Sequence, residues 1–66
     1  MRITLNGEST AAEGTVADLV VQRFGATAGK GIAVAVNGTV VVRGAWIDTA
    51  LLDGDRIDIV TAVQGG

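Results

Sequence analysis

The sequence predicts an α+β domain in which a mixed sheet of four to five strands is covered on one face by a single helix. Two alternating stretches each end in an Asn-Gly pair, at Asn6-Gly7 and Asn37-Gly38, and this pair favours a type I′ hairpin turn. Between these hairpins, residues 15–24 carry apolar side chains at helical spacing. A last alternating stretch, residues 56–62, follows a long connection. The predicted order is therefore two strands, a helix, two strands and a final strand.

The composition fits one globular domain near the lower size limit. The chain has 66 residues, of which 48% are hydrophobic and 18% charged, and a domain of this size buries only about 60% of its unfolded surface. It contains no cysteine, so its stability must come from packing. It has no apolar run near the roughly 20 residues of a transmembrane helix, and its first residues lack the apolar segment of a signal peptide. We therefore expect a cytoplasmic protein with no membrane partner.

The side chains present argue against an enzyme that acts alone. The sequence has no histidine, cysteine or tyrosine, which excludes a catalytic triad, a thiol nucleophile and an imidazole metal site. The net charge is −2 and the cations lie singly along the chain, so nucleic acid is not an expected partner. Neither a catalytic residue, a metal nor a bound cofactor is expected in the chain itself.

The first half of the chain is expected to form a hairpin and the helix. Residues 1–6 alternate as a strand, and residues 9–12 form a short returning strand. Thr15 resembles a helix N-cap, with Asp18 completing a capping box, and Gly25 ends the helix. The apolar stripe of the helix is Val16, Leu19, Val20 and Phe24. We expect Phe24 in the core rather than as a partner anchor, because it completes this stripe.

The second half is expected to form another hairpin, a helical turn and the last strand. Residues 32–37 and 39–43 flank the second turn. A short helical turn is expected around Trp46, whose indole should fill the edge of the core rather than stack on a ligand. Asp53-Gly54-Asp55 then turns the chain into strand 56–62. Two carboxylates without further ligands are more typical of a solvated turn than of a metal site.

This order of elements closes most easily as the β-grasp, or ubiquitin-like, architecture. Right-handed crossovers place the first and last strands side by side and parallel in the centre of the sheet. The domain is expected to span residues 1–62, and residues 63–66 to form a flexible C-terminal tail that ends in Gly-Gly. Because glycine has no Cβ, Gly65 and Gly66 make a ribbon thin enough to enter a channel that would reject a side chain.

The sheet face left uncovered by the helix is a candidate docking surface. The residues expected to point at the helix are Ile32, Val34, Val36, Val40, Val42, Ile57 and Ile59. The other face then carries small apolar residues where a solvated face would carry more charge. The predicted partner-binding surface is Ala33, Ala35, Val41, Val60 and Ala62, with Arg43, Arg56 and Asp58 as its polar rim. A register error of one residue would exchange the two faces, and solvated strands also tolerate scattered Ala and Val.

The chain also resembles a known family, mainly in its second half. The residues that carry the resemblance are Ile32-Ala33-Val34-Ala35-Val36-Asn37-Gly38, Arg43, Trp46, the run from Leu52 to Gly66, and the helix opening Thr15-Val16-Ala17-Asp18-Leu19. On these residues the chain is similar to the thiamine-biosynthesis sulfur-carrier protein family (ThiS-like), which has a ubiquitin-like β-grasp fold. It departs from the family at Val42, where a proline is common, and at Ala11-Ala12-Glu13-Gly14, the lead into the helix.

The resemblance implies a carrier on which other enzymes act. An adenylyltransferase similar to ubiquitin-activating enzymes would use ATP to adenylate the carboxylate of Gly66. A sulfur donor supplied by a cysteine desulfurase system would convert the adenylate to a thiocarboxylate, and thiazole synthase would take that sulfur. Val63, Gln64 and Gly65 are the tail residues implied to enter the partner's channel. ATP is thus used by the partner, and this chain binds no cofactor of its own.

Three other functions are consistent with the sequence. The small subunit of molybdopterin synthase shares the fold and the terminal chemistry, although it is usually longer and richer in aromatic residues. A ubiquitin-like protein tag would form isopeptide bonds through Gly66. In an interaction module, the terminal glycines would have no role.

Overall fold

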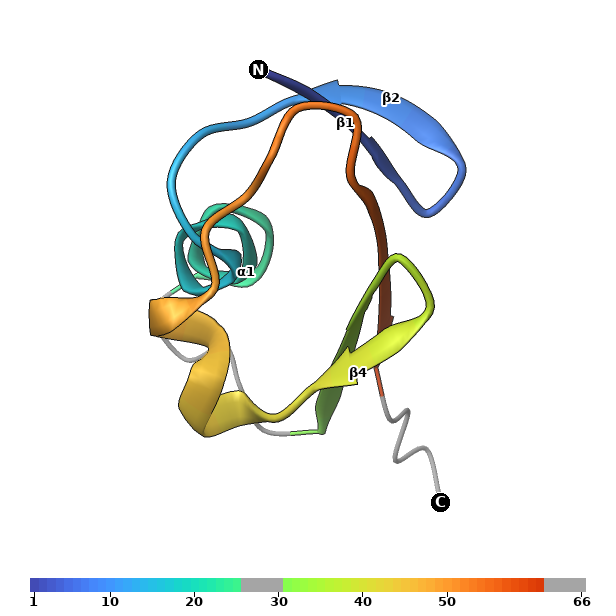
Figure 1. Ribbon diagram of the computed structural model, residues 1–66. Helices are drawn as coiled ribbons and strands as arrows, with labels where there is room; N and C mark the ends of the chain where they lie inside the picture. Colours follow the sequence, from blue (N-terminus) through green and yellow to red (C-terminus); the bar gives the residue numbers. More distant parts are fainter. Residues whose placement is uncertain (26–30, 62–66) are drawn as a thin grey trace.

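A computed structural model describes residues 1–25 and 31–61 of the chain. One helix, α1, packs across one face of a five-stranded mixed sheet with the strand order β2-β1-β5-β3-β4 (Figure 1). The elements are β1 (Arg2–Leu5), β2 (Glu8–Ala11), α1 (Val16–Phe24), β3 (Ile32–Val36), β4 (Thr39–Val41), a 3₁₀ helix η1 (Arg43–Asp48) and β5 (Arg56–Thr61). The predicted fold class is confirmed. In the described ranges, no helix has the length and apolar character needed to cross a membrane.

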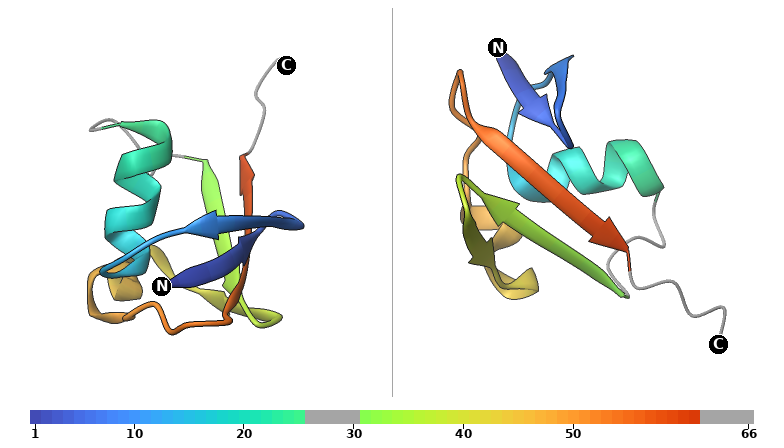
Figure 2. Two further views of the ribbon diagram at one scale, coloured as in Figure 1. Left: turned by 90° about the horizontal axis from the view of Figure 1, so that it is seen from above. Right: turned by 90° about the vertical axis from the view of Figure 1, so that its right-hand side faces the viewer.

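The first and last strands lie side by side, as the sequence predicts. β1 pairs with β5 in parallel, with Thr4 opposite Arg56 and Leu5 opposite Ile57. β5 also pairs antiparallel with the whole of β3, so it is bonded on both of its edges. Figure 2 shows α1 on one side of this sheet, and among residues 1–25 and 31–61 no helix covers the opposite side.

Both Asn-Gly pairs form the predicted hairpin turns. Asn6 and Gly7 have φ of 49° and 86°, and Asn37 and Gly38 have φ of 51° and 86°. Two successive residues with positive φ define a type I′ turn, which matches the twist of the flanking strands. Asparagine and glycine are the residues that enter this left-handed region most readily. The turns therefore fix two-residue hairpins at β1–β2 and β3–β4.

The helix begins at the predicted capping box and ends at the predicted glycine. The backbone N–H of Asp18 donates to Thr15 Oγ1 at 3.2 Å, and the backbone N–H of Thr15 donates to Asp18 Oδ2 at 2.9 Å. Gly25 ends the helix with a φ of 85°. Each of the first four strands is shorter than predicted or shifted by a residue or two at its ends; for example, the predicted strand 39–43 stops at Val41. The predicted loop lies mostly in residues 26–30, outside the described residues.

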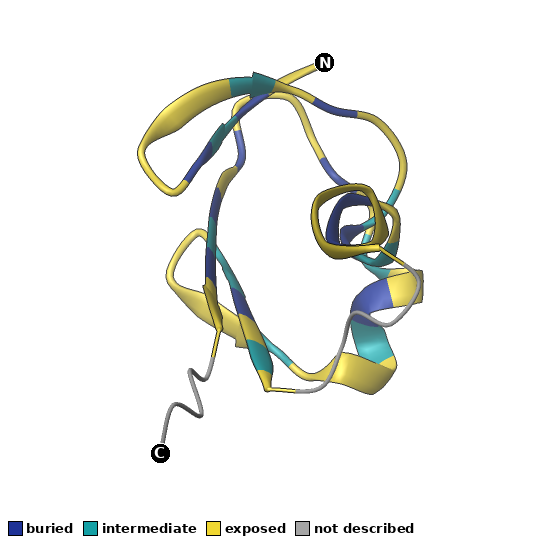
Figure 3. Cartoon of the chain, turned by 180° about the vertical axis from the view of Figure 1, so that it is seen from behind, coloured by how far each residue is buried: buried dark blue, intermediate teal, exposed yellow. Residues whose placement is uncertain are grey.

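The core lies between α1 and the sheet, where buried positions of the strands face those of the helix (Figure 3). Its members are Ile3, Leu5, Ala12, Val16, Leu19, Val20, Val34, Trp46, Leu51, Ile57 and Ile59. Trp46 is 5% exposed, as predicted, and its Nε1–H donates to the carbonyl oxygen of Val41 at 2.8 Å. A buried indole N–H needs such an acceptor, so η1 is tied to the end of β4.

The prediction that Phe24 belongs to the core is wrong, because this side chain is 40% exposed. At 3.6 residues per turn, Phe24 lies about 80° around the helix from Val16, at the margin of the apolar stripe. It is also the last residue of α1. The stripe that packs on the sheet is therefore limited to the first two turns of the helix.

Candidate functional site

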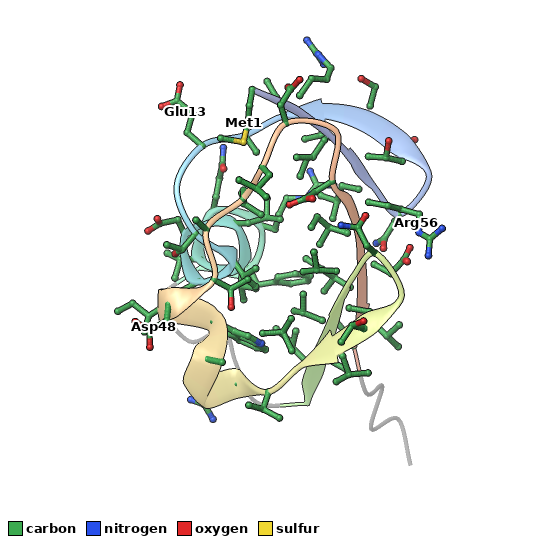
Figure 4. All side chains as sticks on the ribbon, viewed as in Figure 1. Met1, Glu13, Asp48 and Arg56 are labelled. Atoms are coloured by element: carbon green, nitrogen blue, oxygen red, sulfur yellow. The ribbon has the colours of Figure 1, made fainter. Side chains whose placement is uncertain are left out.

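The sheet face that points away from α1 is the first part of the candidate site. Ile57 and Ile59 of β5 are buried, and side chains alternate along a strand, so the residues between and beside them point the other way. Cross-strand partners lie on the same face, which adds the residues of β3 and β4 opposite them. We name this surface the open face; it consists of Ala33, Ala35, Val40, Arg56, Asp58 and Val60. Figure 4 shows Arg56 on the side of the sheet away from α1.

The open face combines exposed apolar side chains with a single ion pair. Val40 and Val60 are 68% and 64% exposed. Arg56 Nε lies 3.6 Å from Asp58 Oδ2, and both side chains remain accessible to solvent. A surface ion pair of this kind contributes only about 0–1 kcal/mol to stability. The face therefore adds little to folding, and an accessible apolar surface with a polar rim is typical of a docking site.

The structure brings five of the predicted surface residues together and separates two others, Val41 and Arg43, from them. The five are Ala33, Ala35, Arg56, Asp58 and Val60. The prediction for Val41 is wrong, because it lies opposite Val34, which is 1% exposed, and packs against the core. Arg43 is the first residue of η1, beyond the last residue of β4, so it does not belong to the sheet face.

Val40 and Val42 were predicted to face the helix, and this prediction is also wrong, since each is 68% exposed. The two-residue turn places Val36 opposite Thr39, which puts Val40 opposite Ala35 of the open face. Three consecutive valines show no alternation of their own. The turn, rather than the hydrophobic pattern, therefore decides which valine points outward.

The beginning of β5 is held by a network of side chains that sequence reasoning missed. The backbone N–H of Arg56 donates to Asn37 Oδ1 at 2.9 Å, and Asn37 Nδ2 donates to Asp55 Oδ1 at 3.0 Å. The other carboxylate oxygen, Asp55 Oδ2, accepts from the backbone N–H of Leu52 at 2.8 Å. Asp55 is only 9% exposed, so the prediction of a solvated turn is wrong for this residue.

The carboxylate of Asp55 thus serves the turn, because both of its oxygens bind donors of the protein. Within residues 1–25 and 31–61, no group of three or more acidic residues is placed to hold a metal ion. The sequence marks Asn37 and Asp55 only as turn residues. They lie 18 positions apart, so no local pattern shows that the side chain of Asn37 reaches Asp55.

The second half of β5 is bound by Asn6, the asparagine of the first hairpin turn. The backbone N–H of Ile59 donates to Asn6 Oδ1 at 2.8 Å, and Asn6 Nδ2 donates to the carbonyl oxygen of Ile59 at 3.3 Å. β5 then ends at Thr61, which lies opposite Ile32. The predicted site residues Ala62, Val63, Gln64, Gly65 and Gly66 follow directly and lie outside the described residues. The predicted tail therefore continues from the strand that crosses the open face.

A model of a protein family described as the ThiS family matches residues 3–66. The chain belongs to the ThiS family. The match includes the predicted tail, and it confirms the family to which the sequence is similar.

A solved structure agrees with this assignment. The fold of this ThiS-family chain is similar to the crystal structure of a thiamine biosynthesis protein (ThiS) from Geobacter metallireducens, with a TM-score of 0.78 and 26% sequence identity. The similarity covers 100% of each chain. No curated protein matches the sequence significantly.

Proposed function

We propose that this chain is a sulfur carrier of thiamine biosynthesis that delivers sulfur for the thiazole ring. The observation that carries the proposal is the family match over residues 3–66, which includes the Gly65-Gly66 end. Similarity over the full length to a thiamine biosynthesis protein supports the same pathway. A sequence without histidine, cysteine or tyrosine fits a protein on which other enzymes act. In this proposal residues 1–62 are the carrier domain and residues 63–66 its tail.

The proposed chemistry starts at the carboxylate of Gly66. A terminal carboxylate is an anion at neutral pH, and nucleophiles do not attack it without activation. An ATP-dependent adenylyltransferase would join a carboxylate oxygen to the α-phosphorus of ATP, and pyrophosphate would leave. Sulfide, released when a thiol reduces the persulfide formed by a cysteine desulfurase system, would then form a bond to the acyl carbon. AMP would leave with the electron pair of the broken C–O bond, so that the terminus becomes a thiocarboxylate.

The open face and the tail would have separate roles toward the partners. The partners are the adenylyltransferase, a sulfur donor supplied by a cysteine desulfurase system, and thiazole synthase. The open face supplies exposed apolar contact area, whereas the glycine tail has little side-chain surface to offer. An extended tail of residues 63–66 reaches about 13 Å, enough to carry the terminus from the rim of the sheet into a partner's pocket. Binding is therefore assigned to the open face and access to the tail.

Replacing Val60 by aspartate should weaken docking on the adenylyltransferase. Val60 is 64% exposed on the open face, and a charge buried in an apolar interface without a partner is unfavourable. We expect affinity to fall by about tenfold, as for loss of an interface contact worth about 1.4 kcal/mol. Isothermal titration with the adenylyltransferase measures this affinity.

The matched control is Val21→Asp, which introduces the same charge at a 54% exposed position of α1. It lies on the other side of the molecule and should leave the affinity unchanged. Equal losses in both variants would mean that net charge, rather than the open face, governs binding.

The proposed function is tested by the mass of the intact chain. The chain is incubated with the adenylyltransferase of its host, ATP and a sulfur donor, and its intact mass is then measured by mass spectrometry. Replacement of one oxygen by sulfur at Gly66 is the expected result. Conjugation to lysines of other proteins would instead identify a protein tag, and an unchanged mass would support a simple interaction module. Restored growth of a strain that lacks its thiazole sulfur carrier, on medium without thiamine, would separate the thiamine pathway from that of molybdopterin.

A further inference from the structure

The two edges of β5 are held in different ways. Along one edge, all five residues of β3 pair with β5, from Ile57 to Thr61. Along the other edge, β1 pairs only with Arg56 and Ile57, because the chain turns away at Asn6-Gly7. The backbone N–H of Asn6 still donates to the carbonyl oxygen of Ile57 at 2.9 Å. From there on, the edge of β5 that faces β1 needs another partner.

The side chain of Asn6 is that partner. A primary amide carries a donor and an acceptor, as a peptide group does. Asn6 uses both on one residue of β5, since Oδ1 accepts from the N–H of Ile59 and Nδ2 donates to its carbonyl oxygen. The side chain thus continues the hydrogen bonding of β1 by one step after the backbone of β1 has ended. Within the described residues, Ile59 is the last one of β5 bonded on this edge.

We infer that Asn6 is a positioning residue for the C-terminal tail. By holding Ile59 against the first hairpin, it fixes the last part of β5, from which the tail starts. The inference rests on the proposed function, in which a partner acts on the carboxylate of Gly66. Once the partner holds the tail, a change of direction at Ile59 would displace the domain end of the tail relative to the partner's reacting groups. A misplacement of about 1 Å at a reacting group can cost on the order of 100-fold in rate.

The geometry restricts the residue type that can serve here. Asn6 has a φ of 49°, a region that few residues with side chains enter easily, with asparagine and aspartate among the exceptions. Aspartate would keep the acceptor for the N–H of Ile59 but lose the donor to its carbonyl oxygen. Glycine would keep the backbone conformation and lose both bonds. This allows the side chain to be removed without straining the turn.

The chain contains its own matched control at Asn37. It occupies the same position of the other type I′ turn, with a φ of 51°, and its amide also makes two hydrogen bonds. These bonds hold Arg56 and Asp55, at the start of β5 and away from the tail. Each glycine substitution therefore removes two side-chain hydrogen bonds. Asn6→Gly removes them from Ile59 in the second half of β5, and Asn37→Gly removes them from Arg56 and from Asp55 just before the strand.

The first measurement is amide hydrogen exchange of the isolated chain by NMR, with rates expressed relative to the core amide of Val34. In Asn6→Gly, exchange should accelerate at Ile59 and also at Val60, because the exit end of β5 opens more often. In Asn37→Gly, acceleration should be confined to Arg56 and its surroundings. If Val60 exchanges at the wild-type rate in Asn6→Gly, or equally fast in both variants, the inference is overturned.

The second measurement is adenylation of each variant at a temperature where all are folded. Asn6→Gly should lower kcat by about tenfold, from misplacement of the terminus, with little change in KM, because the open face is intact. Asn37→Gly should retain the wild-type kcat, and Asn6→Asp should recover part of the loss. A merely structural role would make the two glycine variants alike. If wild type is not adenylated, the proposed function fails, whereas the exchange rates still decide the role of Asn6.

Discussion

Gly65→Val is expected to lower adenylation by about 100-fold or more while leaving the domain folded. Reaction rates fall by about this factor when reacting groups are misplaced by roughly 1 Å, and a β-branched side chain displaces a glycine ribbon from a narrow channel by more than that. Gly65 lies in the predicted tail, so the valine should not disturb the core between α1 and the sheet. ATP–pyrophosphate exchange with the adenylyltransferase measures the reaction, and thermal unfolding checks the fold.

The control for Gly65→Val is Gly44→Val in η1. A Cβ added at Gly44 meets no heavy atom within 4 Å, so the same substitution should leave both adenylation and stability near wild type. Adenylation of Gly65→Val at the wild-type rate would show that the partner does not enclose the tail in a narrow channel. In that case the open face alone would account for binding to the adenylyltransferase.

Ile57→Ala is expected to have the largest effect on stability. Ile57 is 0% exposed and lies in β5 between β1 and β3. Truncating a buried isoleucine to alanine costs about 2–5 kcal/mol. Domains have a total stability of about 0.05–0.15 kcal/mol per residue, or roughly 3–10 kcal/mol for a chain of this length. The variant should therefore lose a large part of its stability. If the loss is about 5 kcal/mol and the wild-type stability is near the lower end of its range, the variant should be unfolded.

Urea unfolding followed by the fluorescence of Trp46 measures the loss, since this buried residue is the only tryptophan of the sequence. Ile47→Ala is the matched control, because Ile47 is 70% exposed and its truncation should change stability by no more than about 0.5 kcal/mol. Equal effects of the two substitutions would contradict the placement of Ile57 in the centre of the core.

Several features of the fold and the site could be predicted because neighbouring residues determine them. Thr15 and Asp18 form a capping box within one helical turn, and each Asn-Gly pair forms its own turn. The alternation around Ile57 and Ile59 placed the two faces of β5 correctly. This alternation therefore predicts Arg56, Asp58 and Val60 on the open face, where the structure places them.

The hydrophobic pattern alone misassigned β4, because Val40, Val41 and Val42 are all apolar. The pairing of β3 with β4 decides that Val41 packs inward and Val40 points outward. For Phe24, the spacing along the helix was not enough to predict burial. Burial of a residue in the last turn of α1 also depends on whether the sheet extends beside that turn. Asp55 looked like part of a solvated turn until the fold brought Asn37 to its carboxylate.

The sequence alone predicts the order of elements, both hairpin turns, the ends of the helix and the family, and the structure and the family match confirm them. Each of these depends on residues within a few positions of one another or on a run of matching residues. Strand pairing, in contrast, sets which valine of β4 belongs to the open face and which side chains hold β5. Asn6 and Ile59 are 53 positions apart, and a hydrogen bond between them exists only after β1 and β5 have paired. No local pattern can encode that contact, because it depends on the register of strands at opposite ends of the chain.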